Sequence, residues 1–158
     1  MPQSHQAARV YDALEELIRS VVPSDCRIFQ ANMPLQLMDQ LARESARICT
    51  YLVFQDRRRQ NSSGATLVHD ISVEFSFYGS LADVDDMTTA LTGLFTGSIV
   101  ESSGWRFCLH PNQQSGRRDV WEPRISVKRE WLQFEGIAIE PEAETESEEA
   151  EASGGNNG

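Results

Sequence analysis

The sequence predicts an α+β fold, with a mostly antiparallel sheet and two main helices packed on it. Residues 67–78 alternate apolar and polar side chains with the period of a β-strand. Residues 4–21 and 80–96 instead repeat their apolar side chains at helical spacing. Several other strand-like runs are joined by short loops, which favours antiparallel pairing with the helices on one face.

The first helix is expected from Ser4, a residue type that caps helices, to about Val21. Pro23 then stops it, and a short strand follows at residues 27–30. The apolar stripe of this helix consists of Ala7, Val10, Tyr11, Leu14, Leu17, Ile18 and Val21.

Residues 33–46 are ambiguous in the sequence. Leu35, Met38 and Leu41 have helical spacing, but Pro34 fits only near a helix start. Residues 48–57 are β-branched and aromatic, which predicts a strand. A hairpin loop at residues 60–64 then leads into the returning strand at residues 67–78.

The returning strand and the helix after it form the strongest local pattern. Ile71, Val73, Phe75 and Phe77 share one face of the strand, and Ser72, Glu74 and Ser76 share the other. Gly79 ends the strand, and Ser80 stands at the N-cap with Asp83 three residues on, close to a capping box. Gly97 is a natural C-terminal cap.

The remainder of the body reads as further strands. Residues 105–110 form one strand, and residues 111–116 form a loop. Residues 120–139 form one or two strands, with a kink expected at Pro123 or Gly136. The dipeptides Ser103-Gly104 and Ser115-Gly116 are turn signals only.

The chain divides by composition into one domain, residues 1–140, and an acidic tail, residues 141–158. The net charge is −10, but the seven glutamates between Glu140 and Glu151 leave the body near −3. The tail has no aromatic or large aliphatic residue, so it is expected to be disordered. It serves either as a solvated solubility tail or as an electrostatic arm.

Cysteine usage and hydropathy indicate an intracellular globular protein. Cys26, Cys49 and Cys108 are odd in number and widely spaced, which predicts reduced, mostly buried thiols. The sequence has no CxxC pair and no histidine cluster that would indicate a metal site. No run of about 20 apolar residues predicts a membrane span, and no secretory signal is visible at the start.

The sequence offers no catalytic or cofactor-binding constellation. His5, His69 and His110 are scattered and fit structural or surface roles better than catalysis. Asp83, Asp85 and Asp86 lie near a helix start, where negative charge is favourable without any metal. No phosphate-binding glycine loop, HExxH or GxSxG occurs, so the chain is not expected to be an enzyme.

Two arginine clusters are the candidate interaction residues. Arg57, Arg58 and Arg59 fall at the hairpin, and Arg117 and Arg118 fall in a loop before a strand. Arginine pairs carboxylates through its planar fork, which favours a protein interface. A solvated hairpin tip is the plainer interpretation. Nucleic-acid binding is a third interpretation, but the acidic body opposes it.

In this order the segments resemble the tail terminator (tail completion) proteins of long-tailed bacteriophages. The resemblance covers roughly residues 8–138 and rests on overall pattern, without a single diagnostic motif. Residues 33–46 and the acidic tail depart from that pattern. The matching segments are Val10-Tyr11-Asp12-Ala13-Leu14, Arg27-Ile28-Phe29, Thr50-Tyr51-Leu52-Val53-Phe54-Gln55, Ile71-Ser72-Val73-Glu74-Phe75-Ser76-Phe77-Tyr78-Gly79 with the helix after it, Trp121-Glu122-Pro123, and residues 125–134.

The resemblance implies a structural virion protein, assembled in the host cytoplasm, that forms a hexameric ring. The ring would cap the tail tube and join tail to head at the neck, with genomic DNA passing through its lumen unread. Its partners would be the tube protein and a head-closure or adaptor protein. Two alternatives remain: a head-closure or adaptor protein of the same neck, and a small bacterial α+β ligand-binding or enzyme domain.

Overall fold

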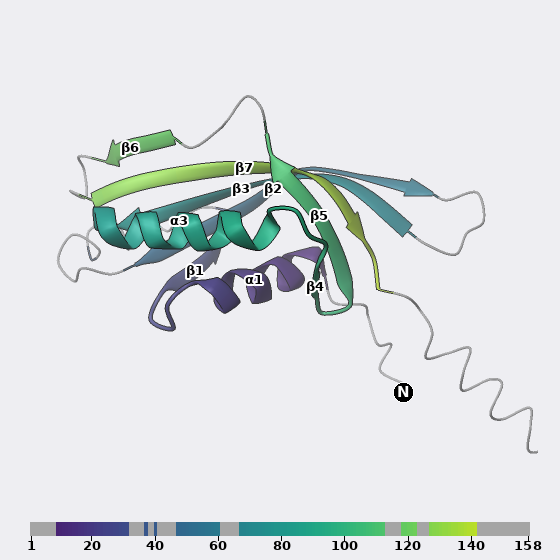
Figure 1. Ribbon diagram of the computed structural model, residues 1–158, viewed down its shortest axis with the longest axis horizontal. Coiled ribbons are helices and arrows are strands. Elements are labelled where there is room, and N and C mark those ends of the chain that lie inside the picture. Colours follow the sequence, from purple (N-terminus) through teal and green to yellow (C-terminus); the bar gives the residue numbers. More distant parts are fainter. Residues whose placement is uncertain are drawn as a thin grey trace, which may run out of the picture.

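The computed structural model describes residues 9–31, 37, 40, 47–60, 67–112, 118–122 and 127–141, and gives the backbone alone for 60 and 118–122. Two helices, α1 (Val10–Val21) and α3 (Leu81–Phe95), lie together on one face of a seven-stranded sheet (Figure 1). The predicted α+β class is therefore confirmed. The element expected within residues 33–46 and the acidic tail after Pro141 lie outside the described residues.

The sheet runs in the order β1-β2-β3-β7-β5-β4, and β6 also pairs with β7. All pairs are antiparallel except β1 with β2, so the expected mostly antiparallel sheet is confirmed. The strands are β1 (Arg27–Gln30), β2 (Ile48–Gln60), β3 (Leu67–Gly79), β4 (Val100–Ser102), β5 (Trp105–Pro111), β6 (Arg118–Glu122) and β7 (Val127–Ile139).

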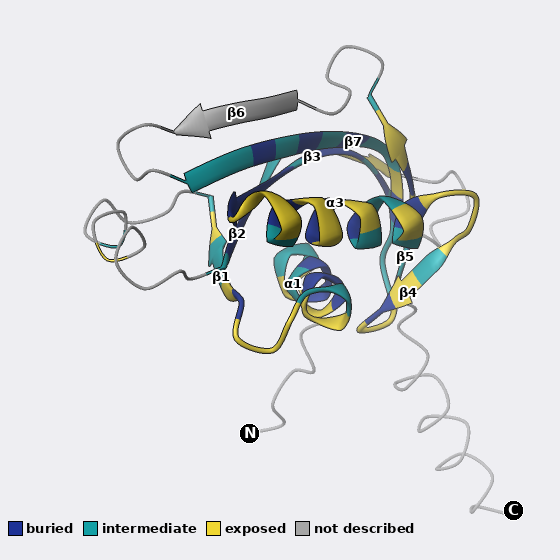
Figure 2. Ribbon diagram, turned by 60° about the vertical axis from the view of Figure 1, so that its left-hand side comes forward, coloured by how far each residue is buried: buried dark blue, intermediate teal, exposed yellow. Residues whose placement is uncertain are grey.

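The core lies between the helices and the inner face of the sheet (Figure 2). The predicted β3 face is confirmed, because Ile71, Val73, Phe75 and Phe77 are all buried. Phe75 and Phe134 meet edge to face, with 5.8 Å between their ring centroids. The helices contribute buried side chains at helical spacing: Ala13, Leu14, Leu17 and Ile18 from α1, and Val84, Met87, Leu91 and Phe95 from α3.

Local signals set the helix ends. The hydroxyl of Ser80 accepts a hydrogen bond from the Asp83 amide at 3.2 Å, so the predicted N-cap is confirmed. Gly97, with a φ of 74°, takes the left-handed conformation expected just beyond the helix. α1 begins later than predicted, after Arg9, and the proposed cap at Ser4 lies outside the described residues.

Two turn and strand details depart from or refine the sequence interpretation. Ser103 and Gly104 both have positive φ and join β4 to β5 as a two-residue hairpin, with β4 too short for the sequence to have indicated it. Residues 118–139 form two strands, β6 and β7. At Gly136 the backbone of β5 approaches its ladder partner β7 closely. A Cβ added there would sit 2.0 Å from the Cys108 carbonyl oxygen. Within the described residues no helix is long and apolar enough to cross a membrane.

Candidate interaction surface

The Arg57–Arg59 cluster lies within β2 and not at a loop tip, because β2 continues to Gln60. The three residues pair in register with Asp70, His69 and Val68 of β3. Arg59 forms an ion pair with Asp70 at 2.8 Å. Arg58 lies 3.5 Å from Glu140, and Arg57 has no ion pair among the described residues. All three are exposed, so their charges remain at the surface.

The structure does not bring the two arginine clusters together. Arg117 lies outside the described residues, and Arg118 begins β6 opposite Trp131. Through β7 and β3, that position aligns with Thr50 at the start of β2. Arg58 is eight residues further along β2, roughly 26 Å away at 3.3 Å per residue. The two clusters therefore belong to opposite ends of the sheet.

Beside the arginines lies a buried histidine that the sequence interpretation undervalued. The His69 side chain packs edge-on against Trp105 and lies between two carboxylates. Its Nδ1 is 2.7 Å from Asp56 Oδ1, and its Nε2 is 2.7 Å from Glu140 Oε1. Both ring nitrogens therefore lie within hydrogen-bond distance of a carboxylate oxygen. The His69 side chain thus ties β2, β3 and the end of β7 together as a structural clamp. His110, by contrast, is largely exposed.

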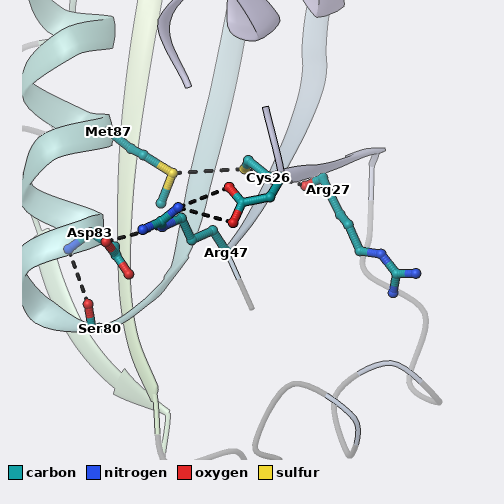
Figure 3. Close-up of polar contacts among 7 residues, drawn as sticks. Cys26, Arg27, Arg47, Ser80, Asp83 and Met87 are labelled. Atoms are coloured by element: carbon teal, nitrogen blue, oxygen red, sulfur yellow. Dashed lines mark hydrogen bonds and ion pairs between the residues drawn. The ribbon is translucent and has the colours of Figure 1, made fainter. Parts of the chain in front are cut away.

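A second polar junction anchors α3. The Arg47 guanidinium lies 3.1 Å from Asp83 on α3 and 2.9 Å from Asp25 before β1 (Figure 3). The hydrogen bond to Arg47, and then the one to Ser80, hold the pKa of Asp83 below its usual value. The carboxylates of Asp83 and Asp25 in turn raise the pKa of Arg47. Asp83 therefore serves α3 anchoring, in keeping with the expected structural role of the acidic cluster.

The thiols show no activated nucleophile. Burial raises the pKa of Cys26 to about 11 and raises that of Cys49 well above its usual value. A thiol that stays protonated is a poor nucleophile and a poor metal ligand. Cys26 and Cys49 are free and buried and Cys108 is free and exposed, so the prediction of mostly buried thiols is confirmed. In the described part of the chain, no group of three or more His, Cys, Asp or Glu side chains could hold a metal ion.

An apolar groove of about 640 Å³ lies between α3 and β7 and is here called the α3–β7 groove. Small side chains form its α3 wall, namely Thr89, Thr92, Gly93 and Thr96. Leu132, Gln133 and Phe134 form its sheet side, and Pro111 closes one end. A methyl group added at Gly93 would meet no described atom within 4 Å. The lining has no titratable side chain, so the described walls suit apolar packing better than acid–base chemistry.

The opposite edge of the sheet carries an open strand. β1 pairs only with the first four residues of β2, and the Tyr11 hydroxyl then donates to the Val53 carbonyl at 3.4 Å. Beyond that point β2 has a described ladder partner only on its β3 side. A bulge lies at Phe54, whose side chain is 46% exposed. The sheet therefore has a groove toward one edge and an exposed aromatic with arginines at the other.

Comparison with known proteins gives a distant likeness to solved structures. No family model matches the sequence, and a search of curated proteins finds no match either. A solved chain described as "Virion of native gene transfer agent (GTA) particle" is 16% identical, with a TM-score of 0.44. The match covers 85% of this chain and 94% of that chain.

Proposed function

We propose that this protein is a structural virion protein that forms a ring on the end of a phage tail tube and joins tail to head. The observation that carries the proposal is that each copy presents two unlike surfaces, the α3–β7 groove and the open edge of β2. A closed cyclic assembly needs this kind of heterologous contact, in which two unlike surfaces of each copy are complementary.

The tail-terminator resemblance supports the proposal residue by residue. Its opening segment begins α1, and its long aromatic segment is β3 followed directly by α3. Residues 50–55 lie in β2, at the edge that stays open. The described parts of the quoted segments therefore belong to the helices and strands of one sheet-and-helix body.

In this role the protein acts by shape and charge, with no chemical step. The ring would contact the tube protein on one side and a head-closure or adaptor protein on the other, and DNA would pass through its lumen. A body of mildly negative charge suits such a conduit, because like charge keeps phosphate from adhering.

The experiment is the mass and symmetry of the protein with and without tail tubes. We expect a closed ring, six-fold, at tube ends in electron micrographs, and native mass measurements that detect it when tubes are present. A monomer in dilute solution is compatible with a ring that forms only on the tube. A single or non-cyclic copy at the neck would contradict the proposal, and a ring bound only to heads would favour the adaptor alternative.

A small-molecule binding or enzyme domain is the second candidate, favoured by the α3–β7 groove. Its volume lies within the range of ligand sites, and its base is apolar. Such sites also carry convergent polar groups, whereas the described lining offers threonine hydroxyls and one glutamine. A monomer that binds apolar ligands in this groove and ignores tail tubes would support this candidate.

A further inference from the structure

The α3–β7 groove has an apolar base and a wall of small residues, so it can accept a large apolar side chain. Phe134 and Leu132 at its base are almost completely buried, so the groove reaches down to the core. Gly93 leaves the helix wall open. An aromatic ring entering here would pack on Phe134 and be removed from water, as at the centre of a stable interface.

Phe54 is the exposed aromatic that suits this groove. The large hydrophobic side chains exposed in the described part of the chain are Phe54, Leu81, Ile99 and Ile137. Ile99 follows α3 directly and Ile137 lies in β7, so both belong to the groove's half of the molecule. Phe54 instead lies at a bulge, a feature that re-aims a side chain, on the far edge of the sheet. It cannot reach its own groove, because β3 lies between β2 and β7.

We propose that Phe54 of one copy inserts into the α3–β7 groove of the next copy, and that this contact closes the ring. The inference rests on the proposed function and names its subunit contact. The second copy is the occupant because the two features occur on one chain, with β3 between the groove at β7 and Phe54 on β2. Repeating such a contact links copies head to tail and closes when the rotation permits.

The charges beside the two features are complementary in sign and in spacing. The sequence of α3 contains three aspartates and no basic residue. Arg47 forms an ion pair with Asp83, whereas Asp86 is exposed and has no ion pair among the described residues. Asp86 precedes Gly93 by seven helical residues, about 10.5 Å, and Arg57 follows Phe54 by three strand residues, about 10 Å. Seating Phe54 at Gly93 therefore allows Arg57 to reach Asp86.

The first test removes the aromatic and fills the groove in separate variants. We expect Phe54→Ser and Gly93→Leu each to lower ring formation on tube ends at least tenfold. Because Gly93 faces open space within a helix, Gly93→Leu should leave the melting temperature of the subunit unchanged or raise it. Ile137→Ser and Gly93→Ala are the matched controls and should assemble normally. Full assembly by both Phe54→Ser and Gly93→Leu would overturn the contact.

The second test reads the contact directly. Charge reversals Arg57→Asp and Asp86→Arg should each weaken assembly, and the double reversal should restore it. In a Cys108→Ser background, cysteines at 54 and 93 should form a disulfide between copies under oxidation, while cysteines at 54 and 81 should not. Closed rings that lack this cross-link and show no rescue would overturn the contact alone. A wild-type chain that never forms a ring on the tail tube would overturn the proposed function and this contact with it.

Discussion

His69 Nε2 lies 2.7 Å from Glu140 Oε1, and the two residues are 71 positions apart in the sequence. With Asp56 on the other ring nitrogen, this contact ties the first long hairpin to the end of β7. The clamp lies beside the exposed arginines of β2, so it fixes the base from which that part of the hairpin extends. A rigid base matters for an edge that is proposed to meet another subunit, because ordering it in advance lowers the cost of binding.

Removing the His69 side chain should destabilise the fold. In His69→Ala, the carboxylates of Asp56 and Glu140 lose the ring that bridges them, and a buried side chain packed on Trp105 is removed. We expect a loss of about 2–3 kcal/mol in the free energy of unfolding, measured by urea denaturation. His110→Ala is the control, because His110 is exposed, and it should change stability by less than about 0.5 kcal/mol. Equal stability of the two variants would contradict the clamp.

The chain after Pro141 should be dispensable for folding. Pro141 packs near Gly104, and Glu140 holds the clamp, so both belong to the body. The residues beyond contain no large apolar side chain that could anchor them. A truncation after Pro141 should keep the melting temperature within about 2 °C of the full chain. Truncation before Glu140 should lower it clearly, and a large drop in the first truncation would show that the tail contributes to the fold.

Two glycines give opposite expectations for the same substitution. A methyl group at Gly136 would meet the Cys108 carbonyl oxygen at 2.0 Å, so Gly136→Ala must push β5 away from β7. We expect this to cost about 2–4 kcal/mol or to prevent folding. Gly93→Ala meets open space inside a helix and should add up to about 1 kcal/mol. Denaturant melts of the two variants test the close approach of β5 to β7. A Gly136→Ala variant as stable as wild type would contradict it.

The Arg47–Asp83 pair should make stability depend on acid pH. The pKa of Asp83 in the folded state lies below its usual value of 3.8, so the unfolded chain takes up its proton first. Its contribution is therefore present above pH 3.8 and is lost as the pH falls through the lower, folded pKa. Asp83→Asn should lower the melting temperature at pH 7 and match wild type at the acid end. Asp86→Asn is the control, and a pH-independent difference for Asp83→Asn would contradict the pair.

How far the sequence predicted this molecule depends on the range of the interactions involved. The Ser80 cap and the β3 face rest on residues within a few positions of one another, and both are confirmed. The parallel pairing of β1 could not be predicted, because a four-residue strand carries no signal for its partner or direction. The His69 clamp was missed for the same reason, since Asp56 and Glu140 are distant in sequence. The positive φ values at Ser103 and Gly104 show that this turn signal marked the unpredicted strand β4.

The arginines of β2 are the sequence-derived interaction residues that the structure describes in full, and a triple substitution tests them. Changing Arg57, Arg58 and Arg59 to serine removes two surface ion pairs, each worth about 0.2–1 kcal/mol, so the subunit should still fold. Tails should nevertheless grow over-long or fail to join heads, because Arg57 loses its partner on the next copy or on the tube. Arg9, Arg19 and Arg27 are also exposed, and their change to serine alters net charge equally. If both triple variants assemble normally, the arginines are a solvated edge that guards β2 against chance pairing. If both fail alike, net charge and not this surface governs assembly.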